Sequence, residues 1–403
     1  MPNTAIKKTN QTTIEAFCKV VKLCSYKGKE EGFGSNDFVF FTGAGFSKAW
    51  DKNFYGGKDL FETFHTQNDL FRDYIKDYLQ TMSWCELGAL SMDEFKIDFN
   101  DFKKIVFSLE MYEKHGELRP KYIDSNGLKI IRKNLSALIA LKMWKHNPYL
   151  QGYRICPPEN LTKKQKEIVD FFSILRYEKT ASHQGQDGIR INHITTNYDF
   201  VIESIFDTWF HEEDCESHLL YVYRGFTPNE YSGFRGIPVI KYDELTESLF
   251  KLNGGLEIYC NPDGTYKMDY RKKELEDLRK ESPLLVLPSY EQDYSNPYFN
   301  EILQKSKELL VAAKVLVIVG YSLPEEDILI RFLLKHFALD KINFQDKMIF
   351  YINKGGSHAQ LKEKLISVFR ESIDEYYYKQ VHTFSGSFNE FVKQFNQRFI
   401  KKY

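Results

Sequence analysis

The sequence lacks paired cysteines, a long apolar run and an excess of charge of either sign. Its six cysteines are scattered along 403 residues, and no Cys-x-x-Cys pair occurs, so their spacing signals neither a zinc ribbon nor a disulfide framework. The most apolar run, residues 309–323, contains Lys314 and is shorter than the about 20 residues that span a bilayer. The polar first stretch, "MPNTAIKKTNQTT", has no signal-peptide core. We expect a cytoplasmic protein with free thiols and no membrane segment.

Charge is balanced as well. The chain has 55 Lys and Arg residues against 56 Asp and Glu residues, a formal net charge of −1. Such a chain has no general electrostatic attraction to nucleic acid or to anionic membranes. Apolar side chains are plentiful, because 42% of residues are hydrophobic and 16% are aromatic. They supply a large core and further apolar surface for subunit contacts, so we expect a homo-oligomer.

Short apolar runs bounded by turn residues predict an α/β fold. "FVFF" at residues 38–41 is typical of a strand that is buried on both faces of a parallel sheet. Similar runs alternate with helical stretches, which favours a Rossmann-like doubly wound parallel sheet. The further runs are "IRINHITTNYD", "LLYVYRGF", "FKLNGGLEIY", "LLVLPSY", "KVLVIVGYS" and "KMIFYINK". A sheet of this kind binds its ligand at the carboxyl ends of its strands.

The apolar spacing turns helical between residues 64 and 178, which we interpret as a helical insertion between two strands of the sheet. The predicted domains are an α/β domain over residues 1–63 and 179–360, the insertion over residues 64–178, and a C-terminal strand and helix over residues 361–403 that pack on the core.

Glycines follow the first predicted strand in "TGAGFS", residues 42–47. Gly43 and Gly45 allow a tight turn and a close approach to a ligand, and the free N–H groups of such a turn suit a diphosphate. A plain turn between a strand and a helix explains the stretch equally well. On these residues alone both interpretations stand.

A polar cluster follows the next strand in "HITTNYDFVIES", residues 193–204. Period-two alternation puts Asn197 at the carboxyl end of the strand, where a ligand is expected. Asp199 lies at the predicted helix start, where a carboxylate is favoured by the free N–H groups. An ordinary helix cap accounts well for Asp199 and less well for Asn197.

The third stretch is "VLVIVGYSLPEED", residues 315–327. Ser322 and Glu325 have capping-box spacing with Pro324 between them, so a helix is predicted to start here. This interpretation does not explain Gly320, which again allows the backbone at a strand end to come close to a ligand. Asn353 in "FYINK" closes the following strand in the same way.

Four motifs, "GAGFS", "TTNYD", "KLNGG" and "GYSLPEED", occur in this order at predicted strand ends. Together they resemble the sirtuin-like family, and specifically its bacterial branch in antiphage defence proteins. The resemblance covers most of residues 36–355. It leaves out the helical insertion and the C-terminal tail. It implies that NAD binds across the carboxyl edge of the sheet.

The resemblance also implies roles for individual residues. Gly43, Ala44, Gly45 and Ser47 would surround the diphosphate. Asn197 and Asp199 would face the nicotinamide and its ribose, with Thr196 beside them. Gly320 and Ser322 would contact the far ribose and phosphate, and Asn353 would lie near the adenine.

The chain departs from the family pattern in two respects. Protein deacetylases of the family carry a four-cysteine zinc module, and this chain has no cysteine pair. We therefore expect no zinc and no deacetylation, with NAD as the substrate of plain cleavage. The family also has Leu-His-Gly where this chain has Leu252-Asn253-Gly254. An amide orients a water or a hydroxyl but cannot take its proton near neutral pH.

Two functions of different classes follow. The first is an NAD hydrolase that depletes the cofactor in antiphage defence by abortive infection, with Asn197, Asp199 and Asn253 at the reacting bond. The second is a non-catalytic nucleotide-binding subunit of a defence complex, with an ATPase or a nucleic-acid-guided protein as its partner. A nuclease is a minor third, since no carboxylates have metal-ligand spacing.

Overall fold

The computed structural model describes residues 2–26, 38–56, 99–121, 124–150, 155, 160–176, 189–208, 222–232, 247–339, 347–369 and 380–401. Its centre is a six-stranded sheet in which every neighbouring pair is parallel. The strands are β1 (Phe38–Thr42), β2 (Asn192–Thr195), β4 (Ser248–Lys251), β7 (Val315–Val319), β8 (Met348–Asn353) and β9 (Val381–Ser385).

The strand order across the sheet is β4-β2-β1-β7-β8-β9. Counted along the chain, this is the order 3-2-1-4-5-6 of the doubly wound sheets that bind dinucleotides. The chain reverses its direction of winding between β1 and β7, and ligands of such sheets bind at this switch point. The predicted fold class, a Rossmann-like parallel sheet with flanking helices, is confirmed.

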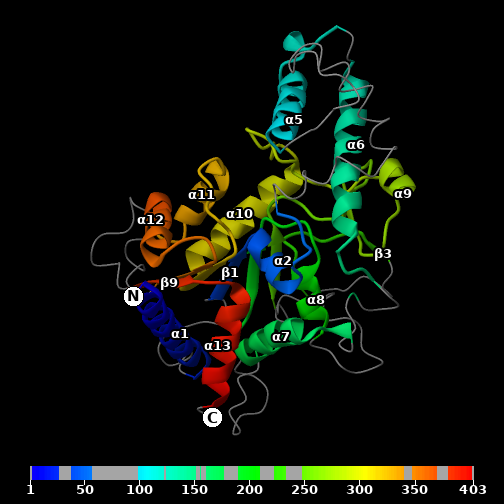
Figure 1. Cartoon of the computed structure of the whole chain (residues 1–403). Helices are drawn as coiled ribbons and strands as arrows, with labels where there is room; N and C mark the ends of the chain where they lie inside the picture. The colour runs from blue at the N-terminus through cyan, green and yellow to red at the C-terminus, as the bar shows by residue number, and fades with distance from the viewer. Residues whose placement is uncertain are drawn as a thin grey trace.

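Alternating side chains divide the core into two layers. On β1, Phe38 and Phe40 pack into one hydrophobic cluster, while Val39 and Phe41 pack into the other. The first cluster is covered by α1 (Pro2–Tyr26), α2 (Ala44–Trp50), α7 (Lys163–Arg176), α8 (Val201–Asp207) and α13 (Phe388–Lys401). The second is covered by α10 (Pro297–Ala312), α11 (Ile328–Lys335) and α12 (His358–Phe369). Both faces of the sheet are therefore buried, as its continuous apolar strands require (Figure 1).

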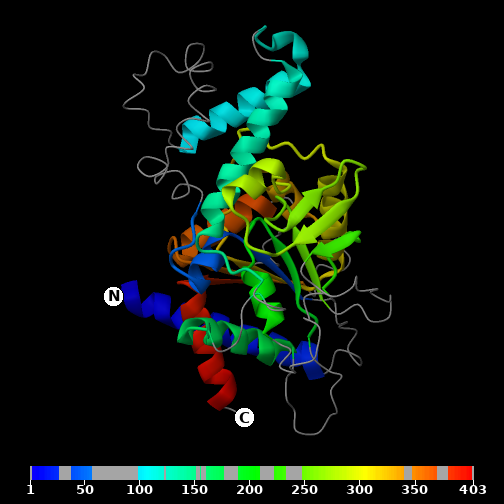
Figure 2. The same cartoon turned by 90° about the vertical axis from the view of Figure 1, so that its right-hand side faces the viewer.

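Two smaller parts accompany this core. The helices α5 (Phe99–Lys114) and α6 (Ser125–Trp144), joined through the short helix η3 (Gly116–Leu118), form a hairpin that projects from one end of the molecule (Figures 1 and 2). A three-stranded sheet holds β3 (Glu230–Ser232), β6 (Tyr266–Asp269) and β5 (Ile258–Cys260), followed by α9 (Leu275–Lys280), on which α6 packs. In the part of the chain described, no helix is both long and apolar enough to cross a membrane.

Segments far apart in the sequence meet at the β9 edge of the sheet. The side-chain amide of Asn10 on α1 donates to the main-chain oxygen of Ser385 and accepts from its N–H, both at 3.0 Å. The hydroxyl of Thr13 donates to the carbonyl of Thr383 at 2.8 Å. Helix α13 packs on both α1 and α7. The first helix and the last strand are thus fixed to each other by polar contacts in a buried layer.

Several sequence-based boundaries need correction. The helix expected to begin at Ser322 begins at Ile328, with Asp327 as its N-cap. The segment between them turns at Leu323, which is buried and has a φ of 53°, so the backbone does not enter the helix earlier. The apolar run at 284–290 is not a strand. Its Leu285 forms an isolated bridge with Gly254, and the run is an extended segment beside the residues that follow β4.

His193 on β2 lies in an apolar environment. It is fully buried, and its ring packs at 5.4–5.6 Å centroid distance against the rings of Phe40, Phe172 and Phe206. Neither ring nitrogen has a hydrogen-bond partner among the described residues. Burial lowers the pKa of His193 to about 3, because a protonated ring would lose its hydration without gaining a partner.

This pKa predicts acid sensitivity of the fold. His193 takes up its proton near pH 6.5 in the unfolded chain and near pH 3 in the native protein. Stability is therefore full above pH 6.5 and falls by up to about 1.4 kcal/mol per pH unit as pH drops through this window. We expect His193→Phe to flatten this part of the curve of unfolding free energy against pH, measured with urea. Equal slopes for wild type and His193→Phe would contradict the assignment.

Candidate functional site

Two glycine-containing turns meet at the switch point between β1 and β7. The N–H of Gly43 donates to the carbonyl of Val319 at 3.1 Å, and the N–H of Gly45 donates to the carbonyl of Gly320 at 2.8 Å. A Cβ atom at Gly45 would lie 2.7 Å from the Cα of Gly320, and Gly320 itself has a φ of 61°. These glycines therefore first serve to pack the two turns backbone to backbone.

Ser47, Asn197 and Asp199 form one hydrogen-bonded cluster beside these turns. The hydroxyl of Ser47, in α2, donates to Oδ2 of Asp199 at 2.6 Å. The amide nitrogen of Asn197 donates to Ser47 Oγ and to the carbonyl of Gly43, each at 2.9 Å. Oδ1 of Asp199 accepts the N–H of Val201 at the start of α8. Burial raises the pKa of Asp199, and the bonds from Ser47 and Val201 oppose this rise.

The amide of Asn253, two residues after β4, is held at both ends. Its nitrogen donates to the carbonyl of Thr196 at 3.1 Å. Its oxygen accepts from the hydroxyl of Tyr294 at 2.8 Å. Its main-chain oxygen accepts the N–H of Val286 at 2.9 Å. Asn253 thus joins the polar loop after β2 to the segment at 284–294, and its side chain has a fixed orientation.

Asn353 plays a similar part at the end of β8. Its amide nitrogen donates to the carbonyl of Tyr321 at 3.1 Å, and its oxygen accepts the N–H of Gly355 at 2.9 Å. Ser322, the residue after Tyr321, is exposed. The turn after β7 is therefore held on one side by Gly45 and on the other by Asn353.

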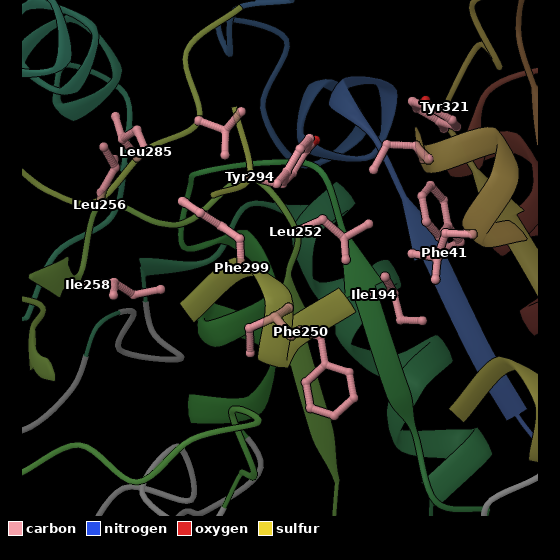
Figure 3. Close-up of a cluster of buried hydrophobic side chains, with 14 of the residues drawn as sticks. Phe41, Ile194, Phe250, Leu252, Leu256, Ile258, Leu285, Tyr294, Phe299 and Tyr321 are labelled. Atoms are coloured by element: carbon pink, nitrogen blue, oxygen red, sulfur yellow. The ribbon is translucent and has the colours of Figure 1, made fainter. Parts of the chain in front are cut away.

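Three tyrosines surround this edge. Figure 3 shows Tyr294 and Tyr321 at the same end of the apolar cluster, with Phe250 at the opposite end. The hydroxyl of Tyr321 donates to Asp327 Oδ2 at 2.5 Å, and that of Tyr198 donates to the carbonyl of Val286 at 2.6 Å. Burial, together with the nearby Asp327 carboxylate, raises the pKa of all three phenols. They are hydrogen-bond donors, not bases, near neutral pH.

A buried ion network lies beneath the polar loop, and sequence reasoning missed it. Nζ of Lys251 lies 2.6 Å from Glu203 Oε1 and 2.9 Å from Glu257 Oε2, and it donates to the carbonyl of Asp199 at 2.7 Å. Arg224 joins Glu203 at 3.4 Å. All four side chains are at most 3% exposed. Burial raises the pKa of Glu257 to about 7, against the pull of Lys251.

The sequence-predicted residues lie along one edge of the sheet, but few of their polar groups are free. The described residues offer no partner to Oδ1 of Asn197, to the hydroxyl of Thr196 or to the N–H of Ala44. Asn197, Thr196 and Ala44 are each half-buried, so these residues lie at the boundary between the core and the solvent. They are the groups at the switch point that a polar ligand could engage.

Comparisons with known proteins give a remote structural likeness. No family model matches the chain, and no curated protein matches it. A structure of Sir2 enzymes aligns over 98% of this chain and 100% of that chain, at 12% identity and a TM-score of 0.40. A Sir2 homologue in complex with NAD covers 96% of this chain and 94% of that chain, at 10% identity and a TM-score of 0.38. At these values no activity is carried over to this chain.

The ion network predicts a large effect of a single substitution. Lys251→Met leaves the carboxylate of Glu257 buried without its cation and leaves that of Glu203 with Arg224 alone. Removing one partner of a buried pair typically costs about 3–5 kcal/mol, so we expect a loss of this size in the free energy of urea unfolding. The control is Lys267→Met, which removes a more exposed pair with Glu281 and should cost about 1 kcal/mol or less. Equal losses in the two variants would contradict the role of Lys251.

Proposed function

We propose that the protein is an NAD hydrolase that cleaves the nicotinamide–ribose bond at the carboxyl edge of the six-stranded sheet. The observation that carries the proposal is the position of Asn197. Its free Oδ1 lies at the switch point of a sheet with the strand order 3-2-1-4-5-6, where dinucleotides bind in sheets of this order. The four sirtuin-like motifs end the strands that surround it.

The free groups of the edge suit the parts of NAD. The N–H of Ala44 at the start of α2 is a donor for a phosphate oxygen. The hydroxyl of Thr196 and Oδ1 of Asn197 can bind ribose hydroxyls or the nicotinamide amide. Ser47 and Asp199 hold Asn197 from behind. Asn353 supports the turn on which Ser322 would meet the far ribose.

In this hydrolysis the bond between the nicotinamide nitrogen and the ribose carbon breaks, and nicotinamide leaves with the bonding electron pair. The oxygen of a water molecule bonds to that carbon, and one proton is released. Because nicotinamide is a good leaving group, positioned polar contacts can supply much of the acceleration. Asn253 can orient a water or a ribose hydroxyl but accepts no proton. We therefore expect the reaction to be slow unless another factor activates the protein.

A second candidate function is a non-catalytic nucleotide-binding subunit of a defence complex. The side-chain amide of Asn253 favours this function, since both of its ends are already hydrogen-bonded, to Thr196 and to Tyr294. A side chain held in this way can shape a binding site without taking part in a reaction. NAD binds in both proposals, and nicotinamide is released in the first alone.

Assembly is part of the proposal under either function, as a homo-oligomer or with a partner such as an ATPase or a nucleic-acid-guided protein. Large apolar side chains are exposed on α11 and just after it. Ile328 is 74% exposed and Phe332 is 56% exposed, with Leu329 and Leu339 beside them. Such a group of exposed apolar residues favours a protein–protein contact.

The site predicts that Asn197 is needed for turnover more than for binding. In calorimetric titrations, Asn197→Ala should lower NAD affinity less than it lowers turnover, because the hydroxyl of Thr196 and the N–H of Ala44 remain for NAD. Nicotinamide release should fall by about tenfold or more in Asn197→Ala, since a positioned contact at the reacting bond is lost. Asn261→Ala, in an exposed turn, is the control. Failure of wild type to bind NAD would refute both proposed functions.

Position 253 gives an opposite prediction. Imidazole accepts a proton near pH 7 where an amide cannot. Asn253→His should therefore raise nicotinamide release by about tenfold or more, as expected for a gained general base, with little change in NAD affinity. Asn261→His is the matched control. If Asn253→His is inert and Asn197→Ala leaves a measurable wild-type activity untouched, the hydrolase is wrong and the nucleotide-binding subunit stands.

A further inference from the structure

A cavity lies outside the strand-end site. It is a cleft of about 600 Å³ between the α5–α6 hairpin and the segment at 284–299. Its volume is in the range of cavities that bind small molecules, about 300–1,000 Å³. The apolar part of its lining includes Leu128 from the hairpin and Leu284, Leu285 and Phe299 from the opposite side.

The charged groups of the cleft differ in how far they are neutralised. Arg132 is surrounded by the carboxylates of Glu110, Glu113 and Asp293 at 3.3–3.5 Å. Arg119 donates to the neutral hydroxyl of Ser125. The described residues place no carboxylate within ion-pair distance of Arg119 or of Lys129. The described residues thus give the cleft an apolar floor and two cations without a counter-charge among them, which suits a ligand with an apolar body and an anionic group.

The wall of this cleft is also the wall of the candidate site. Leu285 lines the cleft, and the next residue, Val286, donates its N–H to the carbonyl of Asn253. Val286 also accepts the hydroxyl of Tyr198 through its carbonyl at 2.6 Å. Asp293 lines the cleft, and the next residue, Tyr294, bonds the side chain of Asn253 at 2.8 Å. In each of two pairs of consecutive residues, the first therefore lines the cleft and the second contacts the candidate site.

We propose that this cleft binds a small molecule with an apolar body and a carboxylate or phosphate group, and that its occupancy shifts Asn253 and Tyr198 through residues 284–294. The effect on NAD rests on the proposed function, whereas binding in the cleft does not. A ligand acts at the other site to the extent that it favours one position of the shared wall. The coupling is reciprocal, so NAD and the cleft ligand change each other's affinity by the same factor.

Binding is tested with two probes, phenyl phosphate and benzoate, which share an aromatic body and distinguish a phosphate from a carboxylate. We expect calorimetry to detect at least one of them at about 10 mM, where a site with a Kd of about 1 mM is mostly filled. The double variant Arg119→Ala/Lys129→Ala should bind it at least about tenfold more weakly, the effect of losing charge-assisted bonds. Lys133→Ala, on the same helix outside the cleft, should bind as wild type does.

A blocking variant guards against misfolding as an explanation. Ser295 is exposed at the rim of the cleft, so Ser295→Trp should keep the unfolding free energy of wild type and lose probe binding. The site is refuted if neither probe binds wild type. It is also refuted if the probe binds Ser295→Trp and the double variant with the affinity of wild type.

The coupling is tested by hydrogen exchange and by NAD titration. The bound probe should change the exchange protection of the amides at 253–256 and 284–294. It should also change NAD affinity, and Tyr294→Phe, which removes the bond to Asn253, should reduce both effects while the probe still binds. Probe binding without a change in exchange would refute the coupling. Altered exchange in a protein that binds no NAD would refute the proposed function and leave the cleft standing.

Discussion

The polar loop after β2 depends on one buried ammonium group. Nζ of Lys251 joins the carbonyl of Asp199 to the carboxylates of Glu203 and Glu257, and so ties β4 to α8 and to the loop between β2 and α8. A buried charge is tolerated when hydrogen-bonding and oppositely charged partners are fixed around it. The buried charge in turn restrains the positions of these partners. Gly255 belongs to this arrangement, because a Cβ atom there would lie 2.2 Å from the Glu257 carboxylate. The network holds the main chain next to Asn197 through the carbonyls of Tyr198 and Asp199.

Most of the conspicuous polar residues at the sheet edge hold turns together. Asn253 uses both ends of its amide to connect separate segments. Asn353 donates across to the turn after β7 and accepts from Gly355 in its own turn, and the glycines at 45 and 320 let two backbones touch. This leaves a small number of unused donors and acceptors facing outward. The chemistry of the edge is therefore decided by how these turns are held relative to one another, which makes the 284–294 wall as important as the residues at the strand ends.

The sequence predicted those features that depend on local pattern. Apolar runs such as "FVFF" and "VLVIV" identified strands because both faces of a parallel strand are buried. The run at 284–290 has a similar composition and is not a strand. The apolar pattern of a short segment does not distinguish a strand paired in a sheet from an extended segment without such pairing. Lys251 gave no signal, because its pairing with Glu203 and Glu257 depends on α8 and the residues around β4 meeting in space.

The contact of α1 with β9 determines when the fold can close. Asn10 and Ser385 are 375 positions apart, and at about 5–20 residues per second a ribosome needs about 20–75 s to supply the second after the first. Every strand that ends at the candidate site leaves the ribosome before β9 does. Until then, β8 presents an unpaired edge that can pair with another chain, and the apolar face of α1 lacks α13. A nascent chain thus carries the whole candidate site for some time before the sheet is sealed.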